Sequence, residues 1–211
     1  GGTEDFNLQL LPGAKGQTLA ARADNFGAVL DALNWTDDVI RGKLEIDGAS
    51  EGIGQPLVAT ITVSDYKVLD LPFMARLINT LSLDGLAQLL SNKQGLEFEK
   101  LKGTIVLEGD VLRFKKLRTS GGSLGLTAAG TIDTASKNID LEGTVVPFTG
   151  VNTVIGSIPI IGDILTGGNG GGVFAATYYA KGKLNDPQFS TNPLSALAPG
   201  IVRNIFFLDD H

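Results

Sequence analysis

The sequence predicts a mainly β fold with a few short helices: an antiparallel meander sheet, curved into an open hydrophobic groove of the β-taco or half-barrel kind. Two observations predict it. Polar and apolar residues alternate along most of the chain, which is typical of strands with one apolar face. Successive runs are joined by short turn-forming segments, such as "DTASKN" (133–138) and Gly109-Asp110, so a parallel nucleotide-binding sheet is disfavoured.

The strands can be placed by this alternation. The clearest example is 124–132, which puts Leu124, Leu126 and Ile132 on one face, followed by 139–146, which does the same with Ile139, Leu141 and Val145. Strands are expected at 6–11, 17–23, 39–48, 56–69, 96–108, 111–119, 124–133, 138–146 and 173–185.

Helices interrupt the meander in few places. Asp24 or Asn25 is a suitable N-cap for "FGAVLDALNW" (26–35), whose apolar residues recur at helical spacing. A second helix is expected after Asp70 and a third after Ser82. We interpret these helices as packing on the sheet.

An apolar sheet face is either covered by a second sheet, as in a sandwich, or left as an open trough. Small residues recur on this face, and they leave room above it, which favours the trough. They are Ala128, Gly130, Gly143, Ala176, Ala180 and Gly182.

Composition excludes several classes of function. The 211-residue chain has a formal net charge of −6 and no basic stripe with interleaved aromatics, so nucleic acid is not an expected partner. It has no cysteine, and its one histidine is His211, so no metal centre, cofactor or histidine-based triad is expected. The carboxylate pairs Asp37-Asp38 and Asp209-Asp210 are sequence neighbours, which point apart on a strand, and we interpret them as solvated charges. The chain is not expected to be an enzyme.

The stretch from Val145 to Leu165 carries one charge, Asp163, but its prolines and glycines make a membrane-spanning helix unfavourable. Its apolar residues fit a short helix that either covers the mouth of the trough or lies at a membrane interface. These residues are Val151, Val154, Ile155, Ile158, Ile160, Ile161, Ile164 and Leu165.

Two long segments resemble AsmA-like envelope proteins, most closely their YhdP branch. They are "LPFMARLINTLSLDGLAQLLSNKQGLEFEKLKGTIVLEGDVLRFKKLRTSGGSLGLTAAGTID" and the later "GTVVPFTGVNTVIGSIPIIGDILTGG" with "GVFAATYYAKGKLNDPQFSTNPLSALAPGIVRNIF". The resemblance covers about residues 40 to 207. It implies a protein held in the inner membrane of a Gram-negative bacterium by an N-terminal helix, with a β-rich body crossing the periplasm and a groove that carries phospholipid towards the outer membrane.

On this resemblance we expect a single β-groove domain over 1–211, a C-terminal fragment of a longer protein, closed by the segments 147–166 and 192–207. Its expected function is non-enzymatic phospholipid transfer. The expected partners are phospholipid, the inner membrane that anchors the full-length protein, the outer membrane at the C-terminal end, and an envelope protein. The alternative is a structural β-sandwich module that docks another envelope protein through its apolar C-terminal helices. Candidate groove residues are Ile105, Leu107, Leu112, Phe114, Leu124, Leu126, Ala128, Ile132, Ile139, Leu141, Val145, Phe174, Ala176 and Tyr178.

Overall fold

The computed structural model describes residues 6–12, 16–52, 54–69, 95–121, 124–147 and 176–192. Within these ranges, the side chains of Leu124, Val146, Pro147, Ala176, Thr191 and Asn192 are not described. The helices expected after Asp70 and Ser82 lie outside the described residues, as do the closing segments 147–166 and 192–207 apart from their first residues.

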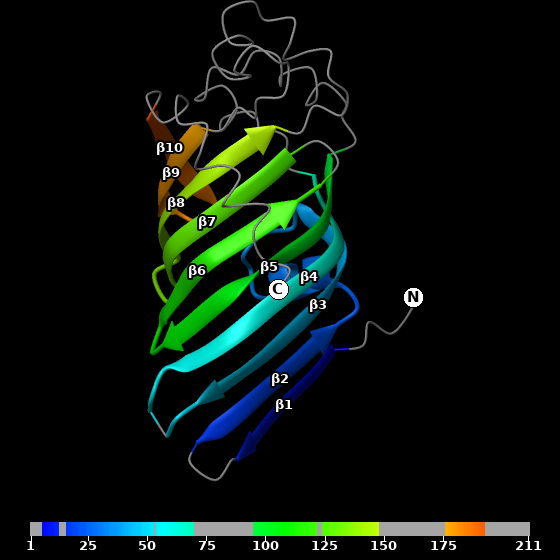
Figure 1. Cartoon of the computed structure of the whole chain (residues 1–211), viewed down its shortest axis with the longest axis vertical. Coiled ribbons are helices and arrows are strands. Elements are labelled where there is room, and N and C mark those ends of the chain that lie inside the picture. Colours follow the sequence, from blue (N-terminus) through cyan, green and yellow to red (C-terminus); the bar gives the residue numbers. More distant parts are fainter. Residues whose placement is uncertain are drawn as a thin grey trace, which may run out of the picture.

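Ten strands form one antiparallel sheet in which each strand pairs with its neighbours in sequence (Figure 1). β1 and β10 are the two edges, so the described strands form an open meander, as the sequence predicts. The strands are β1 (Phe6–Pro12), β2 (Gln17–Ala23), β3 (Val39–Ser50), β4 (Leu57–Val68), β5 (Leu96–Glu108), β6 (Val111–Ser120), β7 (Leu124–Asp133), β8 (Asn138–Pro147), β9 (Ala176–Lys183) and β10 (Asp186–Asn192).

The end of the sheet differs from the prediction. One strand was predicted over 173–185, whereas the structure has β9, a turn at Leu184 and Asn185, and then β10. The sequence of β10 is polar apart from Phe189 and contains Pro187, so it lacks the alternation of the other strands. Proline cannot donate a ladder hydrogen bond and is tolerated at a sheet edge, which is the position β10 occupies.

The sheet is curved because several strands carry bulges or left-handed residues in their interior. Asp65 of β4 has φ 55°, Lys116 of β6 has φ 53° and Gly130 of β7 has φ 133°. At Lys116 the register with β7 shifts by one residue, between Phe114 and Leu117. Such irregularities bend a strand and increase its twist. In Figure 1 the strands accordingly turn from β1 at the bottom to β10 at the upper left.

The described residues contain one helix, α1 (Phe26–Ala32), which packs on β3 and β4. Of the two predicted caps the structure uses Asn25, whose side-chain oxygen accepts a hydrogen bond from the Ala28 amide at 3.1 Å. The helix is shorter than the predicted 26–35, because its C-cap is Leu33 and the next residue, Asn34, adopts φ 52°.

An aromatic cluster joins α1 to the sheet. The Tyr66 ring stacks on Phe98 with centroids 5.2 Å apart and meets Phe26 edge-on at 6.0 Å. The Tyr66 hydroxyl lies 2.6 Å from Thr119 Oγ1, which donates its proton to the Lys100 carbonyl at 3.0 Å. Since a threonine hydroxyl has one proton, the Tyr66 hydroxyl is the donor to Thr119.

Gly42 allows this cluster to form. It has φ 97°, and a Cβ built on it would lie 2.7 Å from the Tyr66 Cβ and 3.3 Å from the Phe26 Cβ. A larger residue would therefore be strained and would separate α1 from β4.

The curl of the sheet brings distant segments together beside α1. The Lys137 ammonium, on the turn between β7 and β8, donates to the Asn34 carbonyl at 2.9 Å. Trp35, which follows α1, and Leu184, in the turn between β9 and β10, both line a cavity of about 690 Å³. The helix therefore lies inside the curve of the sheet, against its apolar face.

Candidate functional site

The strand register assembles one apolar row that crosses the whole sheet. Register partners share a face, so a chain of partners from β1 to β10 can be followed through the successive pairings. Every member of this chain is apolar or glycine. We call it the apolar row: Leu10, Leu19, Gly48, Ala59, Ile105, Phe114, Gly130, Leu141, Ala180 and Phe189.

Burial varies along the apolar face. Val63 and Val145 are fully buried, and Ala59 and Ala180 nearly so. At the β1 edge, in contrast, Phe6, Leu8 and Leu10 are each more than half exposed (56%, 58% and 54%). Most of the apolar row lies between these extremes and is half-buried. An apolar face that stays partly accessible and is exposed at one edge is a candidate place for an apolar ligand or partner.

The structure brings together the predicted groove residues whose side chains it describes. All of them lie on the face of the apolar row, according to the register. Leu107 is exposed (39%), whereas Ile132, Ile139, Val145 and Tyr178 are buried members of the core. The half-buried ones are Ile105, Leu112, Phe114, Leu126, Ala128 and Leu141.

The other predicted residues cannot be placed on this face by their side chains. Leu124 and Ala176 belong to β7 and β9, but only their backbones are described. Phe174 lies outside the described residues, as do the predicted capping residues Val151, Val154, Ile155, Ile158, Ile160, Ile161, Ile164 and Leu165.

The sequence predicted that the small residues leave room above the apolar face, but in the structure not all of them do. A Cβ on Gly143 would lie 2.8 Å from Tyr178 Cε1, so the Tyr178 ring already occupies that space. Leu117 covers Gly103 in the same way, with its Cδ2 at 2.6 Å from such a Cβ. Gly182, with no heavy atom nearer than 4.0 Å, is open. Glycine therefore serves the packing and curvature of the sheet as well as its openness.

The polar part of this face is small and satisfied. The Tyr178 hydroxyl donates to the Thr127 carbonyl at 2.8 Å, and Thr119 is the only buried polar residue in the described part of the chain. Burial raises the pKa of the Tyr66 hydroxyl to about 12, an effect that its hydrogen bond to Thr119 partly offsets. Burial also raises the pKa of Tyr178. Both phenols are therefore neutral at physiological pH.

An apolar cavity of about 310 Å³ extends this face beside α1. Phe6 and Ala23 line one side, and they are register partners on β1 and β2. Ala28, Val29, Ala32 and Leu33 line the other side. Among the described lining residues the one polar side chain is Asn25, which caps the helix, and none is charged. This part of the lining is suited to an apolar group.

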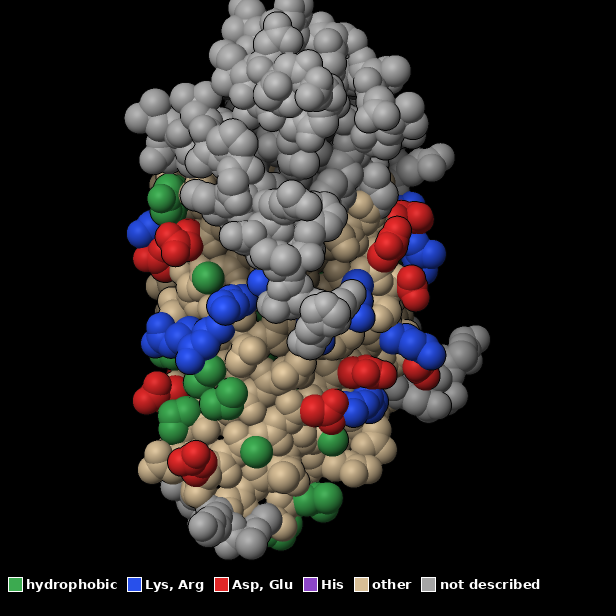
Figure 2. Space-filling view, viewed as in Figure 1, with side chains coloured by type: hydrophobic (Ala, Val, Ile, Leu, Met, Phe, Trp, Pro, Cys, Tyr) green, Lys and Arg blue, Asp and Glu red, His purple; other side chains and the backbone are tan. Residues whose placement is uncertain are grey.

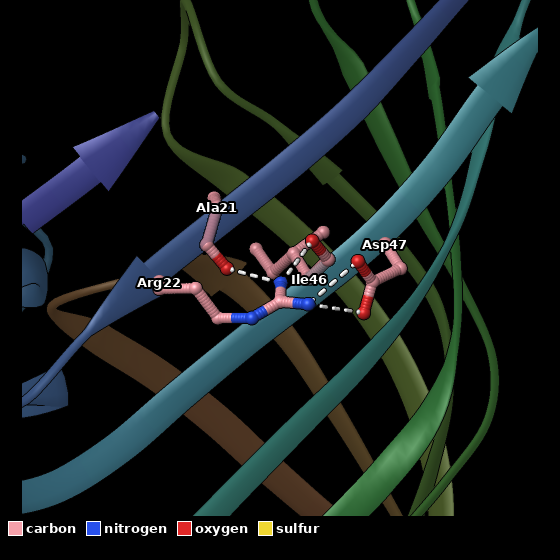
Figure 3. A network of polar contacts seen from close by, with 4 residues as sticks. All are labelled: Ala21, Arg22, Ile46 and Asp47. Atoms are coloured by element: carbon pink, nitrogen blue, oxygen red, sulfur yellow. Dashed lines mark hydrogen bonds and ion pairs between the residues drawn. The ribbon is translucent and has the colours of Figure 1, made fainter. Parts of the chain in front are cut away.

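The reverse face of the sheet is polar. Figure 2 shows charged side chains distributed over it. On this face Arg22 of β2 donates to both carboxylate oxygens of Asp47, at 2.7 and 2.8 Å, and to the carbonyls of Ala21 and Ile46 (Figure 3). Because both side chains are largely exposed, this ion pair between β2 and β3 adds little stability.

Of the two carboxylate pairs noted in the sequence, Asp37 and Asp38 lie away from the apolar row, and Asp209 and Asp210 lie outside the described residues. Asp37 and Asp38 line the cavity of about 690 Å³ together with Asp31 and Trp35. The Asp38 carboxylate accepts a hydrogen bond from the Thr36 hydroxyl at 3.2 Å. The described residues include no cluster of three or more His, Cys, Asp and Glu side chains able to hold a metal ion. None of the helices in the described ranges has the length and apolarity needed to cross a bilayer.

Sequence reasoning missed the two ends of the apolar face. β1 and β2 were predicted as strands, but Phe6, Leu8, Leu10 and Leu19 were not recognised as part of the candidate surface. Their alternation was visible in the sequence, whereas their alignment with β5 and β6 depends on register. Phe189 was missed because β10 was missed.

A family model described as "YhdP protein" matches residues 22–189 of the chain. This match includes α1, β3 to β9, the last two residues of β2 and the first four residues of β10. Neither the curated proteins nor the solved structures gave a match.

Proposed function

The chain belongs to the YhdP family, and on this premise we propose that its apolar face is one segment of a non-enzymatic path for phospholipid between the inner and outer membranes of a Gram-negative envelope. The observation that carries the proposal is the apolar row, which crosses all ten strands without a charged residue.

The energetics suit such a path. Exposing a hydrocarbon tail to water costs about 0.8 kcal/mol per methylene, and an apolar surface offsets this without chemistry or a nucleotide. Adjacent strands are about 4.8 Å apart, so the row spans about 43 Å along its curve. One tail spans about half of a 30 Å bilayer core. A tail can therefore find similar surroundings at successive positions along the row, which favours movement over tight retention.

The headgroup needs no pocket in this arrangement. With its tails on the apolar face, a phospholipid can keep its polar headgroup in solvent at the rim of the groove. The described lining offers no buried charge that would select one headgroup, and its buried hydroxyls on Tyr66, Thr119 and Tyr178 are already hydrogen-bonded within the protein. We therefore expect several phospholipid classes to bind with similar affinity.

The proposed location follows from the family. We place the chain in the periplasm, as part of a longer protein anchored in the inner membrane. The partners proposed for it are phospholipid, the membranes at the two ends of the path, and another envelope protein.

Lipid retention by the purified chain tests the proposal. Leu107 is exposed on the apolar face, and Thr60 of β4 is exposed on the reverse face. We expect native mass spectrometry to detect co-purified phospholipid on the wild type and on Thr60→Glu, and at least tenfold less on Leu107→Glu, because the new carboxylate must be desolvated beneath a tail. Absence of lipid from all three proteins, or equal loading of both variants, would contradict the proposal.

A further inference from the structure

The hairpin formed by β5 and β6 carries a concentration of positive charge on the reverse face of the sheet. We call it the basic patch: Lys100, Lys102, Arg113, Lys115, Lys116 and Arg118. All are exposed except Arg118, which is half-buried. They stand out because the chain as a whole has a net charge of −6. Figure 2 shows blue side chains gathered over the region of β5 and β6.

The register places these cations side by side. Lys102 is paired directly with Arg118, and Lys115 is paired with Thr104, two residues further along β5. The bulge in β6 adds to the patch, because Phe114 and Leu117 both keep to the apolar face while Lys115 and Lys116 between them are both exposed. Like charges opposite each other destabilise a sheet, so this arrangement requires a compensating benefit.

The cross-strand partners of the basic patch carry no acidic side chain, although Glu99 is exposed next to Lys100 on β5. The β4 partners of Lys100 and Lys102 are Ser64 and Thr62, and the β7 partners of Arg113 and Arg118 are Thr131 and Thr127. Arg22, Arg41, Lys67 and Lys181 form ion pairs with described acidic residues, and Arg118 is engaged in an interaction of its own. Within the described part of the chain, Lys100, Lys102, Arg113, Lys115 and Lys116 take part in none of these ion pairs.

The position and composition of the basic patch limit the kinds of partner that could bind to it. Peptides add to sheets at free edges, but β5 and β6 are central strands with both edges paired. Protein interfaces rely on buried aromatic and aliphatic anchors and are depleted of lysine, whereas this patch is rich in flexible lysines and has no aromatic side chain among its members. Nucleic acid is disfavoured by the same lack of aromatics and by the acidic chain. A layer of anionic headgroups needs neither an anchor nor a free edge.

We infer that the basic patch docks this face of the sheet on a bilayer surface that contains anionic phospholipid. Clusters of four to eight Lys and Arg bind such surfaces electrostatically, and each cation near the surface contributes a factor of about five to the partition constant. This surface lies on the opposite face from the apolar row. Its function does not depend on lipid tails occupying that row.

Vesicle co-sedimentation tests the inference. The full chain should bind vesicles of phosphatidylcholine mixed with phosphatidylglycerol, should not bind phosphatidylcholine alone, and should dissociate as salt rises from about 0.05 to 0.5 M. The combined substitutions Lys102→Gln, Arg113→Gln and Lys115→Gln should lower the partition constant about 100-fold. Because these side chains are exposed, the variant should unfold at the same temperature as the wild type or higher.

A matched variant separates the basic patch from net charge. Lys137→Gln, Lys181→Gln and Lys183→Gln remove the same number of charges from the turn between β7 and β8 and from β9. This control should reduce binding several-fold less than the patch variant. Equal losses in the two variants, equal binding to neutral vesicles, or binding of poly-glutamate in place of vesicles would overturn the inference. Normal lipid loading of the patch variant, measured by mass spectrometry, would show that the two surfaces act separately.

Discussion

The buried phenol of Tyr66 shows how single residues organise the apolar face. Its ring fills the space between Phe26 of α1 and Phe98 of β5, while its hydroxyl is satisfied by Thr119 of β6. One side chain thus links the helix to two strands. The neutral form of the phenol is strongly favoured, because ionisation would bury a negative charge in an apolar cluster.

This burial predicts a loss of stability in alkaline solution. The unfolded chain releases the Tyr66 proton near pH 10, whereas the folded chain holds it to about pH 12. Between these values the folded state binds more protons, so stability falls as pH rises, by about 2–3 kcal/mol in all. Tyr66→Phe should weaken this dependence in denaturant titrations between pH 9 and 12.

The control for this prediction is Val63→Ala, which creates a cavity in the same cluster without removing a titrating group. It should lower stability at every pH and leave the alkaline slope unchanged. A slope that Tyr66→Phe does not alter would show that this phenol does not titrate as its burial requires.

The strands depend on a few positions where the backbone leaves the extended conformation. Gly130 of β7 is the sharpest case, because φ is 133° and a Cβ would lie 2.1 Å from the Asp140 carbonyl oxygen. Because Gly130 has no side chain, the backbone of β8 at Asp140 can approach it closely. β7 and β8 therefore stay paired through the bend, where Gly130 is the partner of Leu141.

Gly130→Ala should therefore destabilise the protein by about 3 kcal/mol or more, from backbone strain and the clash together. Gly109→Ala is the matched control, because Gly109 also has a positive φ (58°) but no atom within 4 Å. It should cost about 1 kcal/mol, the usual penalty for an alanine in the left-handed region. Thermal unfolding measures both, and similar losses would mean that the close contact with Asp140 is unimportant.

Much at this scale was predictable from the sequence. The strands over 17–23, 96–108 and 124–133 begin and end at the predicted residues, since alternation and turn residues are local signals. Bulges are not local. By simple alternation, one of Lys115 and Lys116 would face the apolar side of the sheet. The register with β7 shows instead that both lie in a bulge on the reverse face. The role of Gly143 was misjudged for the same reason, because Tyr178 comes from another strand.

At the scale of the whole molecule, the two faces of the sheet differ in character. One face carries the apolar row, and the other carries charged side chains, including the basic patch. The sequence indicated which residues share the apolar face, but the row needed the register of ten strands, and the exposed β1 edge needed the fold. In the two proposals, lipid tails and the headgroup layer contact the protein on different faces of one sheet.

Site-resolved photo-crosslinking tests the central claim, that lipid tails occupy the apolar row and its surroundings. A photoreactive residue at Leu107 or Leu141 lies on the apolar face, and one at Thr60 or Thr131 lies on the reverse face of the neighbouring strand. In cells of a Gram-negative bacterium, we predict that phospholipid is captured at the first two positions and not at the other two. Capture at none of the four, or equally at all four, would contradict the account.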